Sequence, residues 1–286
     1  MVILPVFAAI ALGAGTIIER IILKKKNISI KFYETYSFLA IVLVMIPFIF
    51  FLWNVSPDAL LLKNILILAA VVVLAILANY FTFYSMKWEK LSKLEPAKMV
   101  EPLFTILLAI IFSIFIDATL YERNIKIIIP AIIAGAALIF SHFEKHHLKF
   151  NKYFLAAIIG SFFFASELVV SRLILDNYSS FTFYFVRCTL IFILSLAIFR
   201  PSFTKAKAKT KTIFFLLLTG AIWVAFRTIL YYGYTTFGII FTTLIIMLGP
   251  VFIYLFAWIF LKDKPTWKNI VASIVILGAV LYGLFI

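Results

Sequence analysis

The chain has 286 residues, of which 65% are hydrophobic and only 13% charged, and its mean hydropathy is +1.15. Soluble domains carry about 25% charged residues, so this composition excludes a soluble globular protein and indicates an integral membrane protein whose outer surface is covered by lipid. The formal net charge is +14. Nearly all of the lysines lie in short loops between apolar segments, however, so we expect no nucleic-acid partner.

Ten apolar segments follow one another along the chain, each near the roughly 20 residues that a helix needs to cross the hydrocarbon. Because lipid cannot satisfy backbone N–H and C=O groups, we predict that every segment is an α-helix. The first segment is too long for a signal-peptide core, so we expect it to be retained. The predicted spans are residues 2–23, 33–53, 64–86, 97–116, 125–141, 153–175, 180–199, 212–234, 238–261 and 268–286. The predicted fold class is therefore all-α integral membrane, with ten transmembrane helices.

Basic residues are distributed unevenly between the connecting loops. The loops after spans 1, 3, 5, 7 and 9 carry eighteen Lys and Arg residues, whereas the loops after spans 2, 4, 6 and 8 carry three. The positive-inside rule predicts that the odd-numbered loops are cytoplasmic and that both termini lie on the opposite side. We expect a multi-pass protein of the cell membrane in this orientation.

The two halves of the sequence share short matches in the same order, at an offset near 150 residues. The matches are Arg20 with Arg172, Phe32-Tyr33 with Phe183-Tyr184, Tyr84 with Tyr232, Met99 and Pro102 with Met247 and Pro250, and Gly135 with Gly278. An odd number of spans in each copy forces the two copies into opposite orientations, an arrangement typical of secondary transporters. We predict two inverted five-helix repeats, residues 1–141 and 153–286, joined by a basic loop over 142–152.

One stretch, Tyr232 to Phe285, carries the clearest motif. Leu248-Gly249-Pro250-Val251-Phe252 is followed by Asp263-Lys-Pro-Thr-Trp267 and by Ile276-Leu277-Gly278-Ala279-Val280, and residues 84–140 give a looser copy through Glu101-Pro102-Leu103-Phe104 and Asp117. This pattern resembles the ten-span EamA-type branch of the drug/metabolite transporter superfamily. The resemblance implies export or exchange of small solutes such as amino acids, nucleosides or toxic compounds, through a central cavity between the halves.

The sequence departs from that family in three respects. The family usually has Glu where this chain has Asp117 and Asp263, and its basic residue in the second helix of a repeat matches Arg187 but is Tyr36 in the first copy. Many family members are drawn with cytoplasmic termini, whereas the charge distribution here favours the opposite orientation. The Tyr36 departure predicts a binding site that differs between the two halves.

Ionisable residues within or at the ends of apolar spans cost about 2.5–3.5 kcal/mol at mid-helix and by default mark pathways. Glu167, Arg187 and Arg227 each lie roughly 10–12 Å from the non-cytoplasmic end of their span at 1.5 Å per residue. If they converge, either arginine is a candidate to bind a substrate carboxylate or phosphate, with Glu167 competing for it. The alternative is a closed structural cluster of ion pairs. Arg20 and Arg172, near span ends, are expected to extend to the interface.

Carboxylates on the cytoplasmic side are candidates for coupling transport to protons, because a cavity of low dielectric favours the neutral acid near neutral pH. Among Glu19, Glu34 and Glu101, the first and last are the preferred candidates. The alternative is that they are ordinary acids at the mouth of the cavity. Lys98 lies three residues before Glu101, so an intrahelical pair is also possible.

Aromatic and polar residues on spans 3 and 8 suggest cavity walls. Tyr80, Tyr84 and Trp223 lie close in sequence to Asn79 or Arg227 and offer stacking surfaces and hydrogen-bond donors to a substrate. Pro102 and Pro250 free a backbone carbonyl and can bend spans 4 and 9, which would suit a moving gate. Proline is also tolerated in membrane helices without a functional role.

Motifs for a pump or an enzyme are missing from the sequence. It contains no Walker loop, zinc-protease motif or GxSxG elbow, and Cys188 is its single cysteine. We expect no catalytic residue, no bound metal (despite His142, His146 and His147) and no cofactor beyond possible proton coupling. The favoured function is a secondary transporter of small metabolites working by alternating access, as a monomer or homodimer. The alternatives are a translocase for lipid-linked substrates, recognised by a lateral opening, and a non-transporting scaffold or sensor, recognised by a filled cavity and a fully paired Glu167.

Overall fold

A computed structural model describes residues 3–89, 94, 97–121, 124–142, 151–202, 210–252 and 266–285. These residues are almost entirely helical, and their β-structure is limited to an isolated bridge between Val55 and Tyr178. The helices of the first half are α1 (Ile3–Leu23), α2 (Ile30–Leu52), the short 3-10 helix η1 (Pro57–Leu60), α3 (Leu62–Trp88), α5 (Glu101–Phe115) and α6 (Ile125–His142). Those of the second half are α7 (Lys152–Leu175), α8 (Ser180–Phe199), α10 (Thr210–Thr236), α11 (Ile239–Ile246) and α13 (Trp267–Leu284).

A helix is present in each of the ten predicted ranges. Seven helices are long and apolar enough to cross a membrane, namely those at 4–23, 30–52, 62–88, 152–175, 180–199, 210–236 and 267–284. The apolar helices Glu101–Phe115, Ile125–Ser141 and Ile239–Phe252 are shorter. Residues 253–261 of the predicted ninth span, the acidic residue Asp263, and His146 and His147 of the central loop lie outside the described residues.

Polar residues placed immediately before the apolar segments fix where several helices begin. The side chain of Ser29 accepts a hydrogen bond from the backbone N–H of Phe32 and starts α2. Asn151 caps α7 in the same manner, Ser179 caps α8 and Thr266 caps α13. Each cap satisfies one of the backbone donors that a helix leaves free at its first turn.

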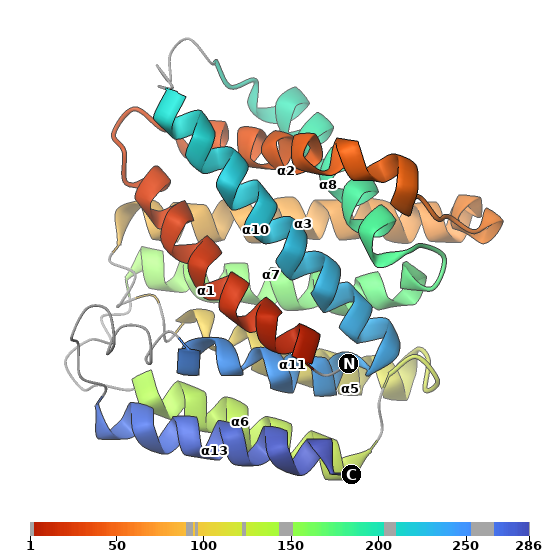
Figure 1. Ribbon diagram of the computed structural model, residues 1–286, viewed down its shortest axis with the longest axis vertical. Coiled ribbons are helices and arrows are strands. Elements are labelled where there is room, and N and C mark those ends of the chain that lie inside the picture. Colours follow the sequence, from red (N-terminus) through yellow and green to blue (C-terminus); the bar gives the residue numbers. More distant parts are fainter. Residues whose placement is uncertain are drawn as a thin grey trace.

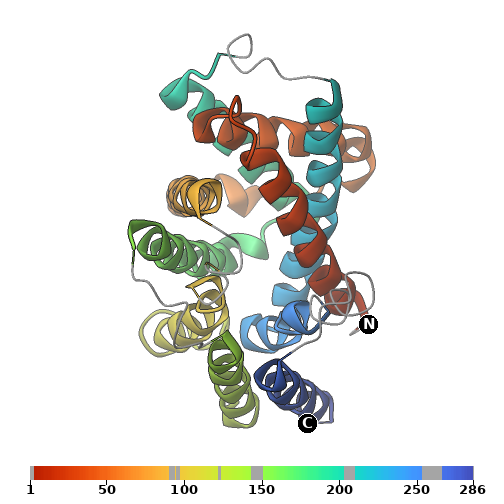
Figure 2. The same ribbon diagram turned by 90° about the vertical axis from the view of Figure 1, so that its left-hand side faces the viewer.

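The helices cross the bundle in alternating directions, and both chain termini lie at one end of it, towards the right in Figure 1. The loop Lys24–Ser29 between α1 and α2 lies at the opposite end. We call these the terminal end and the Lys-rich end. Packing pairs helices of different halves: α3 lies along α7, α1 along α10, α2 along α8, and α6 along α13. In Figure 2, α6 and α13 lie side by side at the bottom of the molecule, away from α2 and α8.

Small residues allow the closest of these contacts. A Cβ on Gly160 of α7 would come within 2.6 Å of Thr82 Oγ1 and 3.1 Å of the Thr82 backbone nitrogen on α3. Small residues at such positions let helix backbones approach closely in membranes, where packing rather than the hydrophobic effect drives association. Gly160 therefore helps to set the spacing of the α3–α7 pair.

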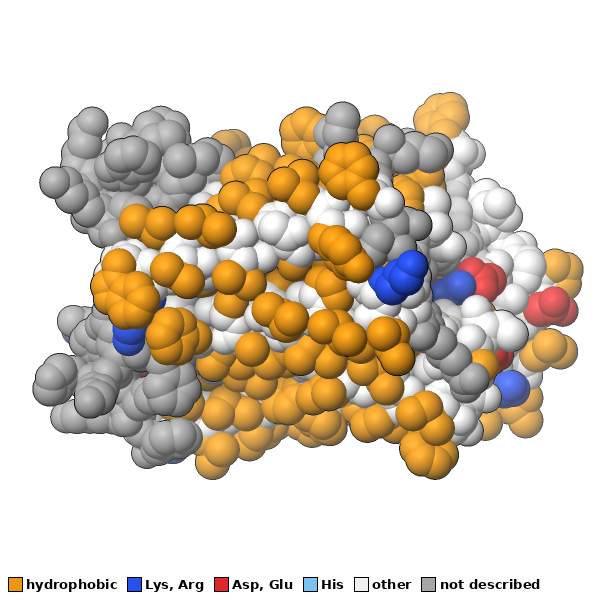
Figure 3. Space-filling model, turned by 90° about the horizontal axis from the view of Figure 1, so that it is seen from below, with side chains coloured by type: hydrophobic (Ala, Val, Ile, Leu, Met, Phe, Trp, Pro, Cys, Tyr) orange, Lys and Arg blue, Asp and Glu red, His pale blue; other side chains and the backbone are white. Residues whose placement is uncertain are grey.

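The outer surface is apolar around the middle of the bundle. Phe50, Phe51 and Phe115 are 82%, 85% and 79% exposed. Figure 3 shows hydrophobic side chains covering the middle of the face seen from below, with charged side chains towards the two ends. This distribution matches a hydrocarbon layer bounded by water, and together with the apolar helices it makes the chain a multi-pass membrane protein.

The two prolines predicted to bend continuous spans are placed differently. Residues 97–98 are helical, Met99 and Val100 form a turn, and α5 starts at Glu101, so Pro102 lies in the first turn of a new helix. Proline is tolerated there because its missing N–H would have no intrahelical partner. Likewise α11 ends at Ile246, and Pro250 lies in the first turn of the helical segment that follows the turn at Met247. The regular helix is thus interrupted shortly before each proline, at Met99–Val100 and at Met247.

Candidate functional site

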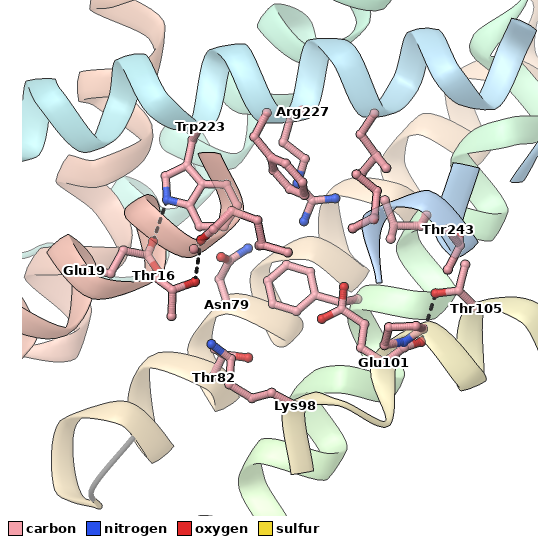
Figure 4. Close-up of a pocket in the computed structure, with 18 of the residues that line it drawn as sticks. Thr16, Glu19, Asn79, Thr82, Lys98, Glu101, Thr105, Trp223, Arg227 and Thr243 are labelled. Carbon is pink, nitrogen blue, oxygen red and sulfur yellow. Dashed lines mark hydrogen bonds between the residues drawn. The ribbon is translucent and has the colours of Figure 1, made fainter. Parts of the chain in front are cut away.

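A cavity of about 160 Å³ lies between the two halves, and every described α-helix except α13 contributes to its wall. Figure 4 shows polar side chains pointing into it from several helices. The polar residues of the wall are Thr16, Glu19, Ser37, Asn79, Thr82, Lys98, Glu101, Thr105, Tyr184, Arg187, Thr219, Trp223, Arg227, Tyr234 and Thr243. A mainly apolar hollow with a few converging polar groups is the usual form of a small-molecule site.

The wall of the cavity extends along much of the bundle. On α1 the wall residues run from Leu12 to Glu19, in the half of the helix that leads to the Lys-rich end. On α3 they run from Asn79 to Phe83, close to the Lys-rich end of that helix. On α8 and α10, Tyr184 and Tyr234 of the wall lie near the terminal end.

An ion cluster borders the cavity on its terminal side. Glu167 of α7 is fully buried, and its Oε1 lies 2.8 Å from Arg187 Nε. The hydroxyl of Tyr231 donates to the same oxygen at 2.9 Å, and Ser171 Oγ donates to it at 3.2 Å. A buried carboxylate requires such partners, because burying an unpaired charge is very costly. The predicted convergence of Glu167, Arg187 and Arg227 is present in the structure.

Arg227 is held less tightly than Arg187. Its Nη1 lies 3.6 Å from Glu167 Oε2 and has no hydrogen-bond partner among the described residues. The guanidinium is placed over the rings of Phe164 and Phe226, at 5.4 and 5.6 Å from their centroids, and it points into the cavity in Figure 4. Two guanidiniums share one carboxylate, so the cluster keeps one net positive charge beside the cavity.

Carboxylates of the first half face this charge. Glu19 Oε1 accepts a hydrogen bond of 2.9 Å from Trp223 Nε1, which joins α1 to α10 across the two halves. Glu101 opens α5 and lies across the cavity from Arg227. Lys98 lines the same wall and interacts electrostatically with both carboxylates. Within the described residues Lys98 forms no ion pair with Glu101, because the turn at Met99 and Val100 breaks the helix that an i,i+3 pair needs.

The hydroxyl and amide side chains of the cavity wall offer mainly hydrogen-bond acceptors to the cavity. Thr16 Oγ1 donates to the backbone oxygen of Leu12 at 2.9 Å, and Thr105 Oγ1 donates to that of Glu101 at 3.0 Å. Asn79 Nδ2 donates to Ala75 O at 2.7 Å. Each donor is used within its own helix, so the oxygens of these side chains remain as acceptors for a bound molecule.

Most residues predicted to form the site line the cavity. Asn79, Trp223, Arg187 and Arg227 are on its wall, as are the proton-coupling candidates Glu19 and Glu101 and the prolines Pro102 and Pro250. Glu167 lies behind the two arginines rather than on the wall.

The two tyrosines of α3 were placed wrongly. Tyr80 stacks on Phe199 with ring centroids 5.8 Å apart, and Tyr84 lies against Tyr153 at 5.5 Å. Neither lines the cavity. The physical reason is the helical rotation of about 100° per residue that follows from 3.6 residues per turn. It turns Tyr80 and Tyr84 away from the face that carries Asn79 and Thr82.

The hydroxyl residues of the wall were missed by the sequence analysis. Thr16 precedes Glu19 by three positions, Thr82 follows Asn79 by three, and Thr219 precedes Trp223 by four. Residues three or four apart share one face of a helix, so a search for polar pairs at this spacing would have found them. Single hydroxyls in membrane helices carry little signal because Ser and Thr commonly bind their own backbone there.

Asp117, the acidic residue of the first motif, has a local structural role outside the cavity. It lies in the loop after α5, where the Thr119 side chain and backbone N–H donate to Asp117 Oδ1 at 2.6 and 2.7 Å. These hydrogen bonds hold the pKa of the Asp117 carboxyl below its usual range. The motif residue therefore stabilises a turn.

Comparison with known proteins agrees with this geometry. Residues 151–284 match the EamA-like transporter family, from the cap residue of α7 to the end of α13. The second half of the chain is therefore similar to the EamA-like transporter family.

No curated protein matches the chain, but 28 chains of solved structures do. One of them, a crystal structure described only as that of a protein, has 14% sequence identity and a TM-score of 0.69 over 99% of this chain and 95% of its own. At that identity the likeness establishes a shared fold over the whole chain.

Proposed function

We propose that this protein is a secondary transporter that carries a small metabolite across the cell membrane by alternating access around the cavity between its halves. The observation that carries the proposal is a cavity whose wall holds Arg227, only loosely paired with Glu167 at 3.6 Å, opposite the carboxylate Glu101. Such charges are expensive inside a membrane and are kept where they serve a pathway.

The chemistry of the wall supports a small substrate with groups of both signs, of which an amino acid is the simplest example. The guanidinium of Arg227, which lines the cavity, can donate N–H groups to a substrate carboxylate. Glu19, Glu101 and the acceptor oxygens of Thr16 and Asn79 offer acceptors to an ammonium group. One charged group at each wall would fix the orientation of the substrate.

The packing of the helices supports two inverted repeats, residues 1–141 and 153–286. Exchanging the halves maps the α3–α7 pair onto the α10–α1 pair and maps the α2–α8 and α6–α13 pairs onto themselves. Helix α1 runs towards the Lys-rich end, and α7 starts from it (Figure 1). Inverted repeats of this kind bind substrate at their interface and alternate by rocking.

Of the alternatives, a scaffold or sensor predicts a filled cavity with Glu167 fully paired. Glu167 is well paired, but the cavity is open and has a polar wall, which favours a transporter. Export is the favoured direction, and the Lys-rich end is the cytoplasmic end in this proposal.

Thermal unfolding of the purified protein with a panel of amino acids tests the proposal. A ligand that binds the folded state raises the apparent stability by about 2.7 kcal/mol at one hundred times its Kd. The amino acid that stabilises most should also exchange across proteoliposomes with its radiolabelled form. If no amino acid stabilises the protein or exchanges, the substrate class is wrong. If a molecule that lacks groups of both signs exchanges instead, the protein is a transporter but the prediction of a substrate with both charges is wrong.

A further inference from the structure

Two loops from different halves are joined at the terminal end of the bundle. The backbone N–H of Ser56 donates to Asn177 O at 2.8 Å, and that of Ser179 donates to Asn54 O at 3.0 Å. Val55 and Tyr178 face each other between these bonds as an antiparallel bridge. We call residues 52–56, 177–179 and Thr182 the loop clasp.

Side chains add further links within the clasp. The hydroxyls of Ser179 and Thr182 donate to the backbone oxygen of Leu52 at 3.0 and 3.1 Å. Thr182 Oγ1 also accepts from the backbone N–H of Asn54 at 3.0 Å, and Ser56 Oγ donates to Asn177 Oδ1 at 3.3 Å. The residues Ser179 and Thr182 belong to the first turn of α8 and its cap, so the clasp ties the end of α2 to the start of α8.

A continuous stack connects the clasp to the ion cluster beside the cavity. The ring of Tyr178 lies 5.7 Å from that of Phe183, which lies 5.0 Å from that of Tyr231. The hydroxyl of Tyr231 donates to Glu167, the partner of Arg187. These contacts therefore link the clasp, through Phe183 and Tyr231, to the ion cluster beside the cavity.

We propose that the loop clasp is the gate of the terminal end, which must open for the cavity to reach that side of the membrane. The proposal rests on the alternating access proposed above. The clasp suits this role because, apart from the buried Thr182, its hydrogen bonds join residues that are at least partly exposed, so water can replace these bonds when the clasp opens. Each such bond changes an equilibrium by a factor of only about 2 to 13, so the contact is reversible in a way that a packed core is not.

The test uses cysteine chemistry, because the native Cys188 is buried. An Asp58→Cys variant, at an exposed position of η1, first establishes which side of the membrane the terminal end faces. A membrane-impermeant maleimide is then applied from that side to a Thr243→Cys variant, whose position lines the cavity. Mass spectrometry of the peptide that contains position 243 gives the labelling rate.

The gate is locked by adding Val55→Cys and Tyr178→Cys. Residues directly opposite in an antiparallel pair of this hydrogen-bonding pattern have Cα atoms about 4.5 Å apart, within the range that a disulfide spans. Oxidation should abolish labelling at position 243 from the terminal side, and reduction of the same sample should restore it. A labelling rate that is the same in both forms overturns the proposal.

Weakening the clasp should have the opposite effect. Ser179→Ala combined with Thr182→Val removes the hydroxyl bonds to Leu52 and should speed labelling by about tenfold. The matched control is Thr266→Ala, which removes the cap of α13 away from the clasp and should leave the rate unchanged. Equal rates in the two variants overturn the gate. Labelling at position 243 needs no substrate, so it tests the gate independently of the substrate class. If labelling depends on the clasp but no amino acid exchanges, the proposed substrate class is wrong and the gate proposal still holds.

Discussion

Replacing Arg227 by glutamine separates substrate binding from the support of Glu167. Arg227 Nη1 is 3.6 Å from Glu167 Oε2, beyond hydrogen-bonding distance, whereas Arg187 Nε is 2.8 Å from Oε1. Glu167 also keeps its hydrogen bonds from Tyr231 and Ser171 in the variant. We therefore expect Arg227→Gln to fold and to lose affinity, and Arg187→Gln to lose stability.

The magnitudes follow from these contacts. A hydrogen bond to a charged group contributes about 1.5–3 kcal/mol, and about 1.4 kcal/mol corresponds to a factor of ten. Arg227→Gln should therefore raise the KM for exchange by roughly 10- to 150-fold. Breaking a buried ion pair by removing one partner costs about 3–5 kcal/mol, so Arg187→Gln should lower the midpoint of thermal unfolding strongly.

The assay is exchange of a radiolabelled amino acid in proteoliposomes, with the unfolding midpoint measured on the same preparations. Arg172→Gln is the matched control, because Arg172 pairs with Asp176 at 2.7 Å near the end of α7 and does not line the cavity. Unchanged KM in Arg227→Gln, with normal expression, would refute the role of Arg227 in binding. An equal loss of exchange in Arg172→Gln would show that the effect is not specific to the cavity.

Three further changes test other parts of the structure. Glu101→Gln should leave folding intact and make exchange independent of an imposed pH gradient if this carboxyl carries the coupling proton, whereas retained pH dependence would remove Glu101 from that role. Glu34 is fully buried and neither carboxyl oxygen has a hydrogen-bond partner in the described part of the chain. Glu34→Met, which replaces the carboxyl group by an apolar group of similar size, should therefore stabilise the fold by about 1–3 kcal/mol in thermal unfolding, and a lower unfolding midpoint would contradict this. Gly160→Leu should strongly reduce the yield of folded protein, since the new side chain collides with the backbone of Thr82; wild-type yield would contradict the packing of α3 on α7.

The positions of the helices could be predicted closely from the sequence, because a segment that crosses lipid must be apolar along its length and must pair its backbone N–H and C=O groups within a helix. Both requirements depend only on the segment itself. Accordingly, α1, α7 and α8 begin and end within two residues of their predicted limits. The fourth helix of each half could not be predicted in the same way. The breaks before Pro102 and Pro250 depend on a local choice between a kink and a new helix, and hydropathy is equally high for both.

The depth of the charged residues within the membrane could also be predicted, because a helix rises by a fixed distance per residue. The number of residues from the end of a span therefore gives the depth of each side chain. Glu167, Arg187 and Arg227 meet as that arithmetic requires. The direction in which each side chain points around its helix axis was harder to predict, because an aromatic side chain can pack against lipid, a neighbouring helix or a cavity. Tyr80 and Tyr84 illustrate the point, whereas Trp223 reaches Glu19 across the cavity wall.

The two sides of the cavity wall differ chemically. The first half supplies the carboxylates Glu19 and Glu101, with Lys98 offsetting one of them, and the second half supplies Arg187 and Arg227. A symmetric site would bind a substrate equally well in two orientations, whereas this one presents opposite charges at fixed places. Such an arrangement favours one orientation of a molecule that has two unlike groups. In the proposed pair of inverted repeats, Tyr36 occupies the position that matches Arg187, so the difference between these two residues contributes to the asymmetry.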